Sequence, residues 1–137
     1  MRKSIASVPL ALALLACHSD KPEAQVRKAF EGCRAAVEAG DAAAATAPLD
    51  AAFRGPEDMD KAMARAFLLG TFRQERIGIT VIQNQVTVAG NDAFQEVDLV
   101  LTGRSGGLLP QDASRRAYRL HWRKVGGDWR LLGIQER

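Results

Sequence analysis

Alternation of apolar and polar residues dominates the second half of the 137-residue chain and restricts its fold more than any other feature. Ile77, Ile79 and Val81 alternate with other residues on one face, and Ile82, Val86 and Val88 follow with the opposite parity, which is the period of a strand with one buried face. The alternation changes parity near Gln83. We therefore expect one long strand with a β-bulge or bend at that point.

Turn motifs divide the rest of this half into further strands. Gly90-Asn91-Asp92 predicts a hairpin turn into a second strand over 93–102, and a glycine-rich loop over 103–112 follows it. A third strand is expected over 116–125, and Gly126-Gly127-Asp128 predicts a tight turn into the last strand. Strands joined in this order predict an antiparallel meander.

The first half has helical spacing instead. A first helix is expected over 24–39, ended by Gly40-Asp41. Asp41 should cap a second helix that runs to about Leu49 or Phe53, with Pro48 near its end. Asp58 should cap a third helix, whose apolar and small residues are Met59, Met63, Ala66, Phe67 and Gly70.

Helices followed by a meander define an α+β domain, with the N-terminal helices packed on one face of a curved antiparallel sheet. The chain after its first 16 residues has the size of one modest domain. We therefore expect a single domain over 24–137.

The start of the chain has the features of a secretory signal. Arg2 and Lys3 precede an apolar run over 5–16, which is shorter than the roughly 20 residues that a membrane-spanning helix needs. Leu14-Leu15-Ala16-Cys17 resembles the lipobox of bacterial lipoproteins, although a small or β-branched residue is more usual where Leu15 stands. The resemblance implies that residues 1–16 are a removable signal peptide and that Cys17 carries the lipid. An ordinary signal peptide with an incidental cysteine is the alternative.

Location follows from this resemblance. Residues 17–23 would form a short lipidated tether that holds the domain close to a membrane of the bacterial cell envelope. His18, rather than Asp, follows Cys17, so the sorting tendency of such lipoproteins points to the outer membrane, facing the periplasm. Loss of Arg2 and Lys3 with the signal would lower the formal net charge from +3 to +1, so we expect no nucleic-acid partner.

Several segments together resemble the NTF2-like superfamily, the cone-shaped domains related to nuclear transport factor 2. The resemblance covers about 24–134 and rests on Ala39-Gly40-Asp41, Leu68-Leu69-Gly70-Thr71-Phe72, Val86-Thr87-Val88-Ala89-Gly90-Asn91-Asp92-Ala93, and Tyr118 to Lys124 with Gly127-Asp128-Trp129-Arg130-Leu131. It implies an NTF2-like cone. Members include isomerases, dehydratases, small-ligand binders and lipoprotein domains without an assigned role, so fold transfers better than function.

The enzymes of this superfamily place an Asp or His inside the cone. Here Gln95, Val97 and Leu99 share one strand face, whereas Asp98 lies on the opposite face. His121 likewise alternates with Leu120 and Trp122. If the apolar sets face the helices, Asp98 and His121 lie outside in a cross-strand charge ladder. The alternative is an acid–base dyad of Asp98 and His121 in an isomerase or dehydratase.

An apolar cavity at the open end of the cone is the other candidate site. Gln95, Tyr118, Trp122 and Trp129 would supply its polar or aromatic lining, or else they are core residues with satisfied hydrogen bonds. Leu108-Leu109 in the long loop is a lid, a dimer contact or simple packing. Cys33 fits a buried small hydrophobe better than a reactive thiol.

Neither a metal nor a cofactor is predicted, because His18 and His121 are isolated from other ligand types and no phosphate-binding glycine loop is present. We therefore expect a non-enzymatic envelope lipoprotein that binds a partner protein or a small apolar ligand near the membrane. A homodimer through the outer sheet face is compatible with this role.

Overall fold

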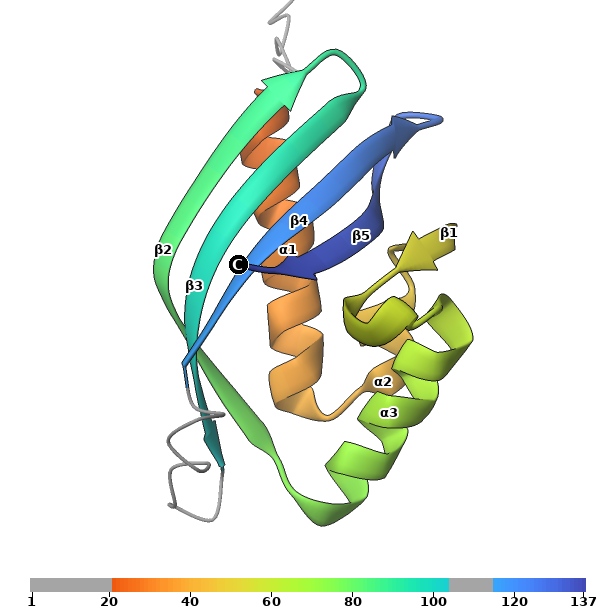
Figure 1. The fold of residues 1–137 in the computed structure, drawn as a ribbon, viewed down its shortest axis with the longest axis vertical. Helices are drawn as coiled ribbons and strands as arrows, with labels where there is room; N and C mark the ends of the chain where they lie inside the picture. The colour runs from red at the N-terminus through yellow and green to blue at the C-terminus, as the bar shows by residue number, and fades with distance from the viewer. Residues whose placement is uncertain (1–20, 104–114) are drawn as a thin grey trace, which may run out of the picture.

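Helices pack against one face of a curved five-stranded sheet (Figure 1). The computed structural model describes residues 21–103 and 115–137. The predicted signal peptide, Cys17, most of the tether and the Leu108-Leu109 motif lie outside the described residues. Within those ranges, no helix has both the length and the apolar character that crossing a bilayer requires.

Helix α1 (Pro22–Ala39) starts two residues earlier than the sequence predicted, inside the expected tether. Pro22 suits this start because its fixed φ is helical and the first helical N–H needs no partner. Gly40 ends the helix in the left-handed region at φ 72°, which glycine adopts without strain. The inner side of α1 buries Val26 and Phe30 against the sheet.

The second predicted helix is much shorter than expected. Asp41 caps α2 (Ala42–Thr46) and accepts a hydrogen bond from the Ala44 N–H at 3.0 Å, as predicted. The extension to Leu49 or Phe53 is wrong, because Leu49–Arg54 forms strand β1. Pro48 has no N–H to continue the helical hydrogen bonds, and its carbonyl accepts the Leu131 N–H at 2.9 Å, next to the pairing of β1 with β5.

The third helix also begins later than predicted. A 3₁₀ turn, η1 (Pro56–Asp58), precedes α3 (Lys61–Gln74). Asp58 lies in that turn at φ 58° and does not cap the helix. Asp60 caps it instead, accepting the Met63 N–H at 2.8 Å, so Met59 lies outside α3.

Four strands follow as the predicted meander: β2 (Ile77–Ala89), β3 (Asp92–Gly103), β4 (Arg115–Val125) and β5 (Asp128–Glu136). The spatial order is β1-β5-β4-β3-β2. The register shifts between Val81 and Gln83, which confirms the predicted bulge. The α+β class is therefore confirmed, although β1 pairs parallel to β5 and makes the sheet mixed.

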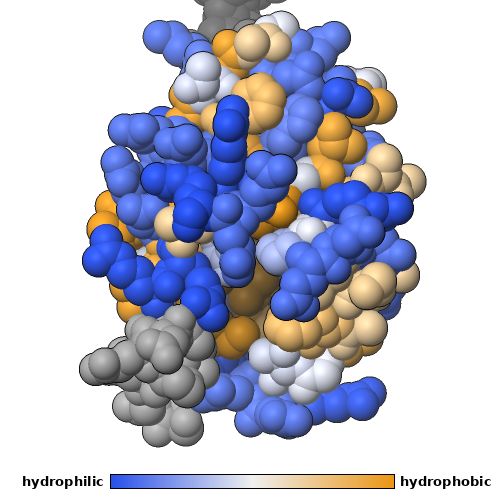
Figure 2. Space-filling view, in the orientation of Figure 1, coloured by the Kyte–Doolittle hydropathy of each residue, from blue (hydrophilic) through white to orange (hydrophobic). Residues whose placement is uncertain are grey.

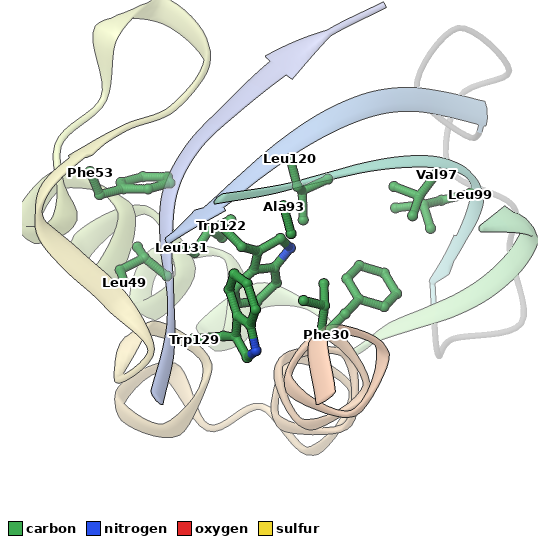
Figure 3. Packing of buried hydrophobic residues seen from close by; sticks show 11 residues of the cluster. Phe30, Leu49, Phe53, Ala93, Val97, Leu99, Leu120, Trp122, Trp129 and Leu131 are labelled. Carbon is green, nitrogen blue, oxygen red and sulfur yellow. The ribbon is translucent and has the colours of Figure 1, made fainter. Parts of the chain in front are cut away.

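The inner faces of the strands and α1 form one core (Figure 3). As the alternation predicted, Val97, Leu99, Leu120 and Trp122 point inward and are buried. Within the described residues, the buried cluster runs from Val26 to Leu131. This cluster joins α1, β1 and the inner faces of β3, β4 and β5 in one hydrophobic core.

Helix α1 also covers the free edge of the sheet at β2. The Glu38 carboxylate accepts the Ile79 N–H at 3.0 Å, and the Arg27 guanidinium donates to the Asn84 carbonyl at 2.8 Å. Arg34 holds Glu38 in place by an ion pair one turn away. Side chains thus satisfy backbone groups that an edge strand would otherwise leave open.

Candidate binding face on helix α3

The structure does not bring Asp98 and His121 together. His121 lies opposite Phe94 in the β3–β4 register, and Asp98 lies four residues further along β3, a separation of roughly 13 Å at about 3.3 Å per residue. Asp98 pairs with Arg137 at 3.1 Å, while the His121 ring contacts Asp92 at 2.8 Å. The geometry provides no shared cavity for an acid–base dyad.

Both residues belong to a polar outer sheet surface. The His121 ring stacks on Phe94 with centroids 4.6 Å apart, and the Arg119 guanidinium lies 4.7 Å from the centre of the same Phe94 ring. The hydrogen bond with His121 lowers the pKa of Asp92 most, and the hydrogen bond and charge of Arg123 lower it further. Asp98 and His121 thus lie on the outer face, but their charged partners are Arg137 and Asp92 rather than each other.

Gln95 and Trp122 lie in the core and do not line an open cavity. Both side chains are fully enclosed. The Trp122 indole N–H donates to Gln95 Oε1 at 2.9 Å, and Gln95 Nε2 donates to Asn84 Oδ1 at 2.9 Å. This relay satisfies the buried polar atoms and leads toward the half-buried Asn84.

The other two predicted lining residues lie apart from this relay. Trp129 is buried beside α1, and its indole N–H donates to Gln25 Oε1 at 3.0 Å. Tyr118 is half-buried on the inner sheet face, where burial raises the pKa of its hydroxyl. The four side chains therefore do not surround one common cavity.

The strongest candidate site is an exposed apolar face on α3. None of the residues in this helix is buried, and Met63, Phe67 and Leu69 are 52%, 59% and 44% exposed. Exposed small residues continue the same surface. We call this surface the α3 face; it consists of Ala62, Met63, Ala66, Phe67, Leu69 and Gly70.

The opposite side of α3 fixes the helix in place. Ala64 packs against the core, and the Lys61 ammonium donates to the Leu49 carbonyl of β1 at 2.8 Å. Helix α3 packs on α2 and β1, at the end of the molecule away from the two hairpin turns (Figure 1). The helix is thus anchored on one side while its other apolar side meets solvent.

Apolar atoms gather over this region of the surface. Figure 2 shows a recess with apolar residues at its floor, between the polar outer surface of the sheet and the α3 side of the molecule. The inner face of the sheet also has half-buried side chains packed against the core, namely Ile79, Val81 and Tyr118. The recess therefore has an apolar floor on the α3 side of the molecule.

Sequence reasoning included Met63, Ala66 and Phe67 in the third helix but did not recognise them as a site. A signal was present, because α3 has a second apolar stripe at helical spacing in Ala64, Leu68 and Phe72. A helix that is apolar on two sides is normally buried on both. In a helix at the edge of a small domain, one of the stripes must lack an internal partner.

The described residues offer little for covalent or metal chemistry. No group of three or more His, Cys, Asp or Glu side chains among them is arranged to hold a metal ion. Burial raises the pKa of the Cys33 thiol to about 11. This thiol therefore remains protonated near neutral pH and is a poor nucleophile.

Solved structures identify the fold. A variant of the Rv3472 protein of unknown function from Mycobacterium tuberculosis matches with a TM-score of 0.71 and 15% identity, covering 83% of this chain and 74% of that one. An NTF2-like protein with a cystatin-like fold from Novosphingobium aromaticivorans matches with a TM-score of 0.68 and 19% identity, covering 82% and 79%. A candidate dehydratase of the NTF2-like family from Streptomyces avermitilis matches with a TM-score of 0.67 and 16% identity, covering 82% of this chain and 91% of that one.

These likenesses define the class: the domain has the NTF2-like cone fold. No family model matches the sequence, and no curated protein matches it either. At such low identity the neighbours show the fold alone, and their names differ from one another in function.

Proposed function

We propose that this protein is a lipid-anchored protein of the bacterial cell envelope that binds a partner protein through the α3 face. The observation that supports this most is the exposure of Met63 and Phe67 on a helix whose other side is fixed to the domain. A contiguous apolar patch of this kind is unusual on a monomer and is typical of interaction sites. Burial of a large apolar side chain contributes about 2 kcal/mol to binding.

A partner protein suits the shape of this surface better than a small molecule does. The α3 face is the outside of a helix, which an apolar groove or a second helix can cover. The recess beside it supports a second candidate, a small apolar ligand, because its floor is apolar and open in Figure 2. We propose no catalytic role for Asp98 and His121, since each has a different partner.

The binding proposal can be tested by photocrosslinking in the cells that produce the protein. A photoreactive residue replaces Phe67, and a control replaces Gln85, an exposed residue of β2. We expect one adduct of defined mass from position 67 and its loss when Met63→Glu is added. No adduct at 67, or the same adducts from position 85, would contradict the proposal.

Lipid anchoring rests on the lipobox resemblance of Leu14-Leu15-Ala16-Cys17 and requires its own test. We expect palmitate supplied to the cells to label the wild-type protein and to leave a Cys17→Ser variant unlabelled. Fractionation should find the labelled protein in the outer membrane. Equal labelling of the two chains would refute the lipid-anchor part of the proposal.

A further inference from the structure

One end of the domain combines the start of α1 with the two hairpin turns of the sheet. The β2–β3 turn and the β4–β5 turn lie at the same end as Pro22 (Figure 1). The Lys124 N–H donates to the Asn91 carbonyl at 2.8 Å and joins the two turns. The bond between Trp129 and Gln25 fixes this end of β5 to α1.

Basic side chains gather at this end, which we call the basic end. The basic residues here are Lys21, Lys28, Arg123, Lys124 and Arg130, and the acidic residues are Glu23, Asp92 and Asp128. Arg123 pairs with Asp92 at 3.3 Å, which leaves Lys21, Lys28, Lys124 and Arg130 in excess over Glu23 and Asp128. Lys28 and Arg130 line a surface hollow of about 500 Å³ beside the Trp129 indole, and Lys124 Nζ lies 5.9 Å from the centre of that indole ring. Val125, 47% exposed, adds an apolar side chain at the tip of the β4–β5 turn.

We infer that the basic end docks on an anionic bilayer surface. The inference rests on the proposed lipid anchor at Cys17, because only residues 18–21 separate that cysteine from α1. Four residues extend at most about 14 Å, so the lipid would hold the start of α1 next to the headgroups. Lysine and arginine near an anionic leaflet are attracted to it, and an exposed valine can enter the headgroup region.

Docking in this way also orients the α3 face. Helix α3 lies toward the opposite end of the molecule from the start of α1 (Figure 1). Contact through the basic end would therefore point Met63 and Phe67 away from the bilayer, toward partners in the aqueous compartment. The anchored protein would present one defined orientation in place of free rotation about its tether.

Vesicle flotation of the unlipidated mature chain, residues 17–137 with Cys17→Ser, tests the inference independently of lipid attachment. This chain contains the whole core and is mixed with vesicles of phosphatidylcholine alone or with 30% phosphatidylglycerol. A basic-end variant replaces Lys28, Lys124 and Arg130 with glutamine. A matched far-end variant replaces three exposed basic residues of α3 and the start of β4, Arg65, Arg73 and Arg115.

We expect the wild type and the far-end variant to float with the anionic vesicles and not with phosphatidylcholine alone. The basic-end variant should bind the anionic vesicles about tenfold more weakly or worse, since each lost charge near the surface weakens binding several-fold. Salt at 0.5 M should release the wild type because it shortens the screening length. Equal loss in both variants, or no preference for anionic vesicles, would overturn the inference, whereas a failure of palmitate labelling would refute only the lipid anchor.

Discussion

The buried relay of Trp122, Gln95 and Asn84 gives the sharpest stability prediction. Replacing Gln95 with methionine keeps the length of the side chain but leaves the Trp122 indole N–H without a partner in a fully enclosed site. An orphaned buried donor costs about 1–3 kcal/mol. We therefore expect a loss of about 2 kcal/mol, or a fall in Tm of about 8 °C at roughly 4 °C per kcal/mol for a domain of this size.

A double-mutant cycle separates the relay from simple packing. Trp122→Phe alone removes the donor, leaves Gln95 Oε1 unpaired and creates a cavity, so it should cost about 2–4 kcal/mol. The double variant loses both partners together and should be more stable than the sum of the single losses by about 1–2 kcal/mol. Urea unfolding of the Cys17→Ser mature chain, followed by far-ultraviolet circular dichroism, measures each corner.

Two results would refute this reasoning. A Gln95→Met loss below about 0.5 kcal/mol would mean that water reaches the Trp122 N–H, since satisfied surface sites tolerate such changes. Strictly additive losses would mean that the two side chains do not depend on each other. Either result would favour a solvent-filled or ligand-binding cavity at Gln95 over a closed core.

Three further predictions concern other parts of the molecule. Phe67→Ala should lower the free energy of unfolding by about 1 kcal/mol or less because Phe67 is 59% exposed, whereas Phe30→Ala should cost about 3–5 kcal/mol; equal losses in urea unfolding would mean that the α3 face is buried. In the Cys17→Ser chain at pH 8, iodoacetamide should alkylate Cys33 about 100-fold more slowly in the native state than in urea, since burial raises its pKa from 9.0 to about 11; fast native alkylation would contradict that burial. Because the pKa of Asp92 is lowered in the native state, its stabilising effect is complete above the unfolded pKa of about 3.9 and is lost as pH falls through the lower native value. The urea midpoints of the wild type and Asp92→Asn should therefore converge in that acid range. A difference that stays constant with pH would refute the ion pairing.

The fold was predictable where the sequence pattern is local. The alternation of Gln95, Val97 and Leu99 identified the inner face of β3, and the parity change at Gln83 located the bulge. Turn chemistry placed the hairpins because glycine at positive φ is required there, as at Gly90 with φ 62°. Such signals depend only on neighbouring residues, so they survive without knowledge of the rest of the molecule.

The missed features depend on contacts between distant segments. Leu49 and Phe53 follow a helical segment in the sequence, but they form a strand because β1 pairs with β5. The two strands lie about 80 residues apart along the chain, since Leu49 pairs with Leu131. The relay was left open for the same reason, because alternation shows that Trp122 points inward but not that Gln95 receives its N–H. For the α3 face, composition gives an apolar stripe, and only tertiary packing decides which stripe remains uncovered.

The hydrogen bonds from α1 to the β2 edge have a consequence for synthesis. Helix α1 precedes β2 in the chain, so Arg27 and Glu38 emerge before the backbone groups of Asn84 and Ile79 that they satisfy. Arg27 and Glu38 are therefore present when β2 forms, and they can bind its edge before the strand of a second polypeptide pairs with the same backbone groups. The order of elements along the chain thus protects the growing domain from intermolecular sheet extension at the stage when it is most exposed.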